Sequence, residues 1–142
     1  MAAQNFKNHR QIVPSFHLLT GLPLGALVFG AIRNLFTTSA DNLYEASLIA
    51  LASLILFSLY AHSRLFALKA QDRAIRAEES LRYFQLTGRR FDSRLSTSQI
   101  IALRFASDEE LPVLAQEAAE RNLSNKEIKQ QIKNWRADTY RV

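Results

Sequence analysis

One uninterrupted stretch, Leu43 to Leu86, limits what this chain can fold into. It contains neither Gly nor Pro, and its first half, Ala46 to Ala61, carries no charged residue. From His62 to Leu86, charged residues alternate with Leu, Ala, Ile and Phe. A helix of about 44 residues is roughly 66 Å long, about twice the ~30 Å hydrocarbon core of a bilayer. We therefore predict a membrane-spanning helix that continues into water as a stalk, with the stalk and its basic loop at residues 63–95.

A second apolar segment, Phe16 to Phe36, has no charge until Arg33 and is also long enough to cross a bilayer. Pro23 has no amide hydrogen, so the carbonyl of Leu19 loses its helical partner and we expect a kink. A secretory signal peptide ends at a small-residue cleavage site. Arg33 and Asn34 follow the apolar segment here instead. We interpret the segment as a retained anchor.

Small residues recur at a close spacing on both apolar segments. They are Gly21, Gly25, Ala26 and Gly30 on the first, and Ala46, Ala50 and Ser53 on the second. Such spacings let helix backbones approach closely in a membrane. We expect these faces to pack the two spans into a hairpin at residues 16–62. A seam between copies of the chain is the alternative.

Basic residues flank the two spans unevenly. Formal net charge is +5, and residues 62–95 hold eight basic residues against four acidic ones. The loop from Asn34 to Asn42 has no basic residue, whereas Lys7 and Arg10 precede the first span. The residues expected at the membrane surface after the second span are Arg64, Lys69, Arg73 and Arg76. Because Lys and Arg concentrate on cytoplasmic flanks, both termini should be cytoplasmic.

The stalk has one regular stripe of apolar residues. Its members follow a 3-4-3-4-3 spacing and are Ala67, Ala70, Ala74, Ala77, Leu81 and Phe84. This spacing is that of the a and d positions of a heptad, at which two helices meet. We predict that the stripe binds a partner, either another membrane protein or a second copy. The alternative is that the C-terminal helices of the same chain cover the stalk. Gly88 should end the helix in the left-handed conformation.

Three Ser-x-x-Glu/Gln motifs predict helix starts in residues 96–142. They begin at Ser96, Ser107 and Ser124 and fit the capping box. We therefore predict an all-α chain whose tail holds three short helices, at about 97–106, 108–121 and 125–138. Pro112 falls inside the second, so we expect either an irregular first turn or a regular helix that begins at this proline. Their shared core should be Ile100, Leu103, Leu114, Ile128, Ile132 and Trp135. The basic side chains of the last helix either face water or contact an anionic membrane surface.

Four stretches resemble a known family of small bacterial membrane proteins classed only as a domain of unknown function. They are QNFKNH (Gln4–His9), LRYFQLTGRRFD (Leu81–Asp92), QIIALRFASDEELP (Gln99–Pro112) and LSNKEIKQQIKNW (Leu123–Trp135). The resemblance implies a two-span protein of a bacterial inner membrane with a cytoplasmic helical tail. It implies no activity, ligand or catalytic residue.

The sequence contains few motifs that indicate a catalytic or ligand-binding site. The chain has no Cys, Gly-rich phosphate loop or HExxH motif. The run Asp108-Glu109-Glu110 is explained by the dipole of the helix expected to begin there rather than by a metal or acid–base site. The positive charge adjoins a membrane span, so we expect lipid rather than nucleic acid as the anionic neighbour.

Two histidines suggest an alternative function, the binding of a haem or a metal ion. His17 begins the first span and His62 ends the second, which would place both at one depth of the membrane. Two imidazoles so placed are able to hold a b-type haem or a metal ion. Interfacial histidines without a ligand are commoner. We therefore expect no cofactor and a non-enzymatic membrane protein, an accessory, scaffold or assembly subunit with residues 1–15 and the tail in the cytoplasm.

Overall fold

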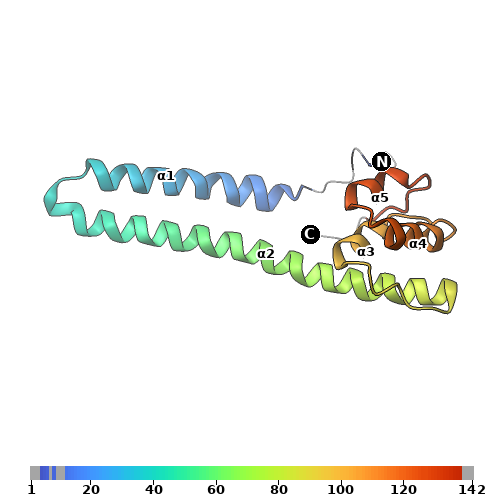
Figure 1. Ribbon diagram of the computed structural model, residues 1–142. Coiled ribbons are helices and arrows are strands. Elements are labelled where there is room, and N and C mark those ends of the chain that lie inside the picture. The colour runs from blue at the N-terminus through green and yellow to red at the C-terminus, as the bar shows by residue number, and fades with distance from the viewer. Residues whose placement is uncertain (1–3, 7, 9–11, 139–142) are drawn as a thin grey trace. The chain divides into compact units, whose positions relative to one another are not determined.

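The computed structural model describes residues 4–6, 8 and 12–138, which fold as helices and connecting segments (Figure 1). The predicted all-α fold is confirmed, since the described residues contain only an isolated β-bridge and no strand. The chain divides into two compact units, one of residues 12–68 and one of residues 1–11 and 69–142. The long helix α2, Leu43–Thr87, belongs to both units and is continuous.

The unit of residues 12–68 contains two helical segments that lie side by side (Figure 1). The first is a π-helical segment η1, Ser15–Gly21, followed by α1, Leu22–Thr37. A short 3-10 helix η2, Ala40–Asn42, leads into the first part of α2. Both helical segments, Ser15–Thr37 and Ala40–Thr87, are long and apolar enough to cross a membrane.

The residues buried in this unit are small. They are Ala31, Ala46, Ala50 and Ser53, each at most 5% exposed. The predicted small-residue face of the second span is therefore confirmed. The prediction is wrong for Gly25 and Gly30, because a Cβ added at either would meet nothing within 4 Å. Ala31, one position after Gly30, is buried instead.

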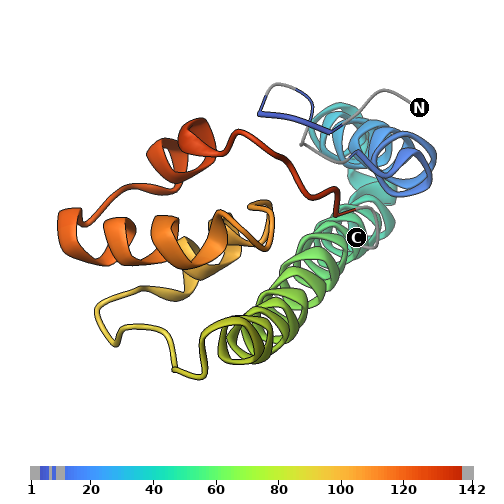
Figure 2. The same ribbon diagram turned by 90° about the vertical axis from the view of Figure 1, so that its right-hand side faces the viewer.

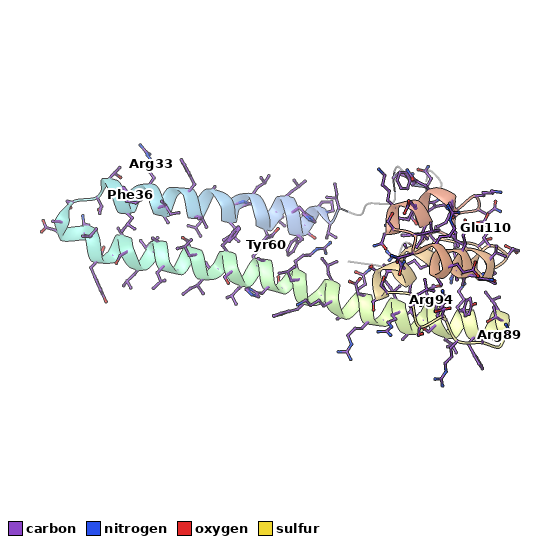
Figure 3. The ribbon with its side chains drawn as sticks, viewed as in Figure 1. Arg33, Phe36, Tyr60, Arg89, Arg94 and Glu110 are labelled. Carbon is purple, nitrogen blue, oxygen red and sulfur yellow. The ribbon has the colours of Figure 1, made fainter. Side chains whose placement is uncertain are left out.

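Gly21 allows a close approach between the two helical segments. A Cβ at this position would lie 2.7 Å from the hydroxyl oxygen of Tyr60. That hydroxyl donates a hydrogen bond to the carbonyl of Phe16 at 3.2 Å, and the two rings stack with centroids 4.2 Å apart. Tyr60 points toward the first helical segment, formed by η1 and α1, in Figure 3. A side chain at residue 21 would displace this ring.

Pro23 lies in the first turn of α1, directly after the π-helical segment. Proline removes a donor and its ring collides with the carbonyl four residues earlier. A wider π turn is one way in which a helix absorbs such a defect. The structure thus places a local change of helix type at the position where the sequence predicts a kink.

The second unit contains residues 69–87 of α2, and the helix ends there as expected. Gly88 has φ +67°, and its amide donates to the carbonyl of Phe84 at 2.7 Å. Three helices follow a loop: α3, Thr97–Leu103; α4, Leu111–Arg121; and α5, Asn125–Gln131. Figure 2 shows α3, α4 and α5 gathered on one side of this part of α2.

Two of the tail helices end earlier than predicted, and the second begins beside Pro112, as one of the two interpretations of that proline expected. The helix expected at 97–106 ends at Leu103, and the one expected at 108–121 begins at Leu111, beside Pro112. The helix expected at 125–138 ends at Gln131, and the chain then becomes extended at Ile132. Trp135 therefore lies outside a helix and pairs with Ala106 in the isolated β-bridge.

The tail core contains all six predicted residues, of which Trp135 is only partly buried. The sequence pattern missed the largest fully buried side chain, Phe105. Its ring centroid lies 4.9 Å from that of Trp135. Leu111 is also fully buried, and Tyr83 of α2 and Phe91 of the following loop pack against the core. The C-terminal half of α2 is therefore part of the same folded unit as the tail.

Candidate partner-binding face of helix α2

The predicted stripe of the stalk lies on one exposed face of α2. We define the α2 face as Ala70, Ala74, Ala77, Leu81 and Phe84, all of which are exposed. Leu81 and Phe84 are 58% and 51% exposed and lie on the same side of the helix as the three alanines, so together they form an exposed apolar patch. Ala67, the first predicted member, lies earlier on the same helix and is exposed too.

The C-terminal helices cover another side of α2. Ile75 is 8% exposed and Glu79 is 6% exposed, and Tyr83 packs against the tail core. At 3.6 residues per turn, Ile75 and Glu79 lie roughly opposite the α2 face. The tail therefore packs on the stalk, as the alternative interpretation expected, but it leaves the predicted stripe uncovered.

A buried ion network fixes this arrangement. The guanidinium of Arg82 donates to Glu79 at 2.8 Å, to Asp108 at 2.7 Å and to the carbonyl of Ala106 at 2.8 Å. Arg136 also approaches Glu79, at 3.4 Å. The side chains of Arg82 and Glu79 are only 11% and 9% exposed, so their charges depend on these partners. Glu79 and Arg82 are structural residues that the sequence pattern did not reveal.

The acidic run before α4 makes specific contacts. Asp108 pairs with Arg82, and Glu110 accepts hydrogen bonds from the amides of Lys133 and Asn134 at 3.2–3.3 Å. The pKa of Glu109 is lowered by hydrogen bonds, first from its own backbone amide and then from the side chain of Ser107. These contacts hold the segment after α5 against the turn before α4, which gives the run a structural role beyond the expected dipole effect.

The capping boxes at Ser96 and Ser124 are both formed as predicted. At Ser107 only half of the motif is formed. The Ser107 hydroxyl accepts from the amide of Glu110, but the Glu110 carboxylate is directed to the segment after α5. The regular helix begins one turn later for this reason and because Pro112 suits a first turn.

An open groove of about 560 Å³ adjoins the α2 face at its C-terminal end. Leu81 and Phe84 line it together with Phe91, Leu95 and Ile100. Polar side chains along it include Ser80 and two arginines, Arg76 and Arg90. Neither arginine has an ion pair within the described part of the chain. The exposed apolar surface of α2 thus continues into a groove with a basic border.

Within the loop, Asp92 and Arg94 form a local pair. The guanidinium and the amide of Arg94 donate to the carboxylate at 2.7–3.0 Å. These hydrogen bonds lower the pKa of Asp92 from 3.8 to about 2. Since Asp92 is bound within its own loop, it does not neutralise Arg90 or Arg76. Figure 3 shows Arg94 and Arg89 on this unit.

The four predicted membrane-surface residues differ in environment. Arg64 lies in the unit of residues 12–68, with its guanidinium carbon 5.5 Å from the ring centroid of Phe16. Lys69, Arg73 and Arg76 are exposed and have no ion pair among the residues that the structure describes. Their positive charge is available to an external anion.

Each of the two candidate ligand histidines lies within hydrogen-bond distance of the backbone carbonyl four residues earlier in the chain. Nδ1 of His17 lies 2.9 Å from the carbonyl of Val13, and Nδ1 of His62 lies 2.7 Å from that of Ser58. In residues 4–6, 8 and 12–138, no three His, Asp or Glu side chains come together in a way that would hold a metal ion. Nothing described here supports the haem or metal alternative.

The comparison with known protein families gives a match. A family model described as a family of unknown function (DUF6526) covers residues 1–142. No curated protein and no solved structure matches the chain. The resemblance to a family classed only as a domain of unknown function is confirmed, because the match covers all four sequence stretches. The chain therefore belongs to the family of unknown function DUF6526.

Proposed function

We propose that this chain is a non-enzymatic integral membrane protein of a bacterial inner membrane. It acts as an accessory, scaffold or assembly subunit that binds a partner through the α2 face in the cytoplasm. The single observation on which this rests is the exposure of the α2 face while the opposite side of the same helix is covered. The sequence flanks of the spans suggest that both termini are cytoplasmic.

The burial of the apolar helices supports the membrane assignment. Only 6% of the most apolar window of Ser15–Thr37 is buried, and 17% of that of Ala40–Thr87. The core helix of a water-soluble protein is mostly buried. Large side chains such as Leu19, Phe29 and Leu59 are 61–76% exposed. Exposure of these apolar side chains to water would be energetically unfavourable, whereas apolar side chains are the normal outer surface of a helix in lipid.

The composition of the α2 face supports the partner-binding part. Four turns of a charged helix present only Ala, Leu and Phe on this side. Alanine alone is explained by helix propensity. Helix propensity does not explain why Leu81 and Phe84 are exposed in the same register. Burial of each of these side chains against a partner would contribute about 1.5–3 kcal/mol to binding.

The test is the double substitution Ala70→Leu with Ala74→Leu in the full-length protein. Added volume should overpack the contact and weaken it by roughly 1–3 kcal/mol per site. The measurement is the amount of partner that co-purifies in mild detergent. Asp72→Leu, at an exposed position outside the α2 face, is the matched control. Equal recovery from the double variant, from the control and from the wild type would contradict partner binding through this face.

A further inference from the structure

We propose that the partner at the α2 face is a second copy of this chain, with the two α2 helices parallel and in register. This inference rests on the proposed function and names its partner. Its basis is the charge pattern beside the α2 face, together with the groove into which the face continues.

Two unpaired charges flank the α2 face at the spacing that a parallel pair requires. With Ala74 at heptad position a and Ala77 at d, Arg73 is at g and Glu78 is at e. In a parallel coiled coil, g of one helix lies beside the following e of the other. Both residues are exposed, and neither has an ion pair within the described residues. Arg73 of one copy would therefore meet Glu78 of the second copy, twice in each dimer.

The next flanking pair, Ser80 with Gln85 of the second copy, is uncharged. An in-register pair thus brings opposite charges together and places no like charges opposite each other along residues 70–85. Chains with one topology in one membrane also present their α2 helices in the same direction. Self-association of this chain therefore satisfies both the charge pattern and the direction of the helices, and no property of another protein has to be assumed.

The groove offers space for Leu81 and Phe84, the two larger side chains of the α2 face. In knobs-into-holes packing, an a residue inserts among four residues of the facing helix. For Leu81 of the second copy these are Ala77, Ser80, Leu81 and Phe84. The last three line the groove of about 560 Å³. The tail packs mainly on the side of α2 that carries Ile75 and Glu79, and Phe91, Leu95 and Ile100 form the other wall of the groove, which a second copy would contact as well.

The absence of Cys from the sequence makes a clean test possible. Ala74→Cys in the full-length protein, oxidised in isolated membranes, should give a disulfide-linked dimer. Asp72→Cys, on an exposed position away from the α2 face, is the control and should give little. Dimer formation at both positions to equal extent would indicate random collision and overturn the proposal.

Charge exchange in the Ala74→Cys background tests the register. Arg73→Glu alone, or Glu78→Arg alone, sets like charges against each other and should lower the dimer fraction about three- to tenfold. The double exchange should restore it. A double exchange that remains as low as the single variants would overturn the parallel register.

Failure of this inference is distinguishable from failure of the proposed function. If Ala74→Cys gives no dimer in membranes while Leu at Ala70 and Ala74 still abolishes recovery of another protein, the second copy is the wrong partner. If neither experiment shows an effect, the α2 face binds nothing and both proposals are wrong.

Discussion

Ser124 and Ser107 have the same local sequence pattern, but only Ser124 closes a complete capping box. Replacing Ser124 by Ala should lower the free energy of unfolding of the tail by about 0.5–2 kcal/mol, since amides at the start of α5 lose their partner. Ser107→Ala should cost less, because no regular helix begins there. Denaturant unfolding of the two variants measures the difference, and equal losses would contradict it.

Glu127 gives the same capping box a pH dependence. Hydrogen bonds to Ser124, first its side chain and then its backbone amide, lower the pKa of Glu127 from 4.5. A carboxyl whose pKa is lower in the folded protein stabilises it fully above pH 4.5, and this contribution is lost as the pH falls through the folded value. In Ser124→Ala we expect the pKa of Glu127, followed by NMR titration, to rise toward 4.5. An unchanged pKa would show that the hydroxyl is not its cause.

Phe105 and Trp135 share one contact but differ in burial. Phe105 is fully buried, so Phe105→Ala should destabilise the protein by about 3–5 kcal/mol. Trp135 is only partly buried and lies on the extended segment after α5, so its replacement by Ala should cost clearly less. Thermal unfolding followed by circular dichroism compares them. A larger loss at Trp135 would mean that this ring, rather than Phe105, is the centre of the core.

Among whole elements, the C-terminal half of α2 depends on one arginine for its attachment to the tail. Arg82→Ala removes the bonds to Glu79, Asp108 and the Ala106 carbonyl and leaves Glu79 buried beside only Arg136. We expect a loss of about 3–5 kcal/mol in stability, as for other broken buried pairs. Arg76→Ala, on an exposed position of the same helix, should change stability by less than about 0.5 kcal/mol. Similar small effects of both variants in denaturant unfolding would argue against the network.

Helix boundaries set by contacts within a few residues could be predicted better than boundaries set by distant contacts. Ser96, Ser124 and Gly88 act through contacts within a few residues, and all three do what their sequence pattern indicates. The early end of α5 depends on Glu110, which binds the amides of Lys133 and Asn134 from 23 and 24 residues away. Such a contact has no periodic signal, so the sequence alone favoured a longer helix.

Prediction of the candidate site is limited in the same way, because contacts between distant residues leave no periodic pattern in the sequence. Heptad spacing identified Ala70, Ala74, Ala77, Leu81 and Phe84 as one face, and the structure shows that this face is open. Which side of α2 the tail covers could not be predicted. That choice depends on Ile75, Glu79 and Arg82, whose 4-3 spacing mixes one apolar with two charged residues. Buried charged pairs are hidden from a pattern that counts only apolar residues.

At the scale of the whole molecule, the continuous helix α2 carries two kinds of surface. Between Leu43 and Leu68, α2 exposes large apolar side chains and buries small ones, as lipid-facing helices do. From Lys69 to Thr87 the same helix packs one side on a tail core. Our central claim is that the first part lies in a membrane and that the loop between the spans is on its outer side.

Cysteine labelling of intact cells tests this claim most directly, because the sequence has no Cys of its own. Ser39 lies between the two apolar helices and Ser93 in the loop after α2, and both are exposed. A membrane-impermeant thiol reagent added outside should label Ser39→Cys and should reach Ser93→Cys only after the cells are lysed. Labelling of Ser93→Cys but not of Ser39→Cys in intact cells would reverse the topology, and recovery of both variants in the soluble fraction would contradict a membrane protein altogether.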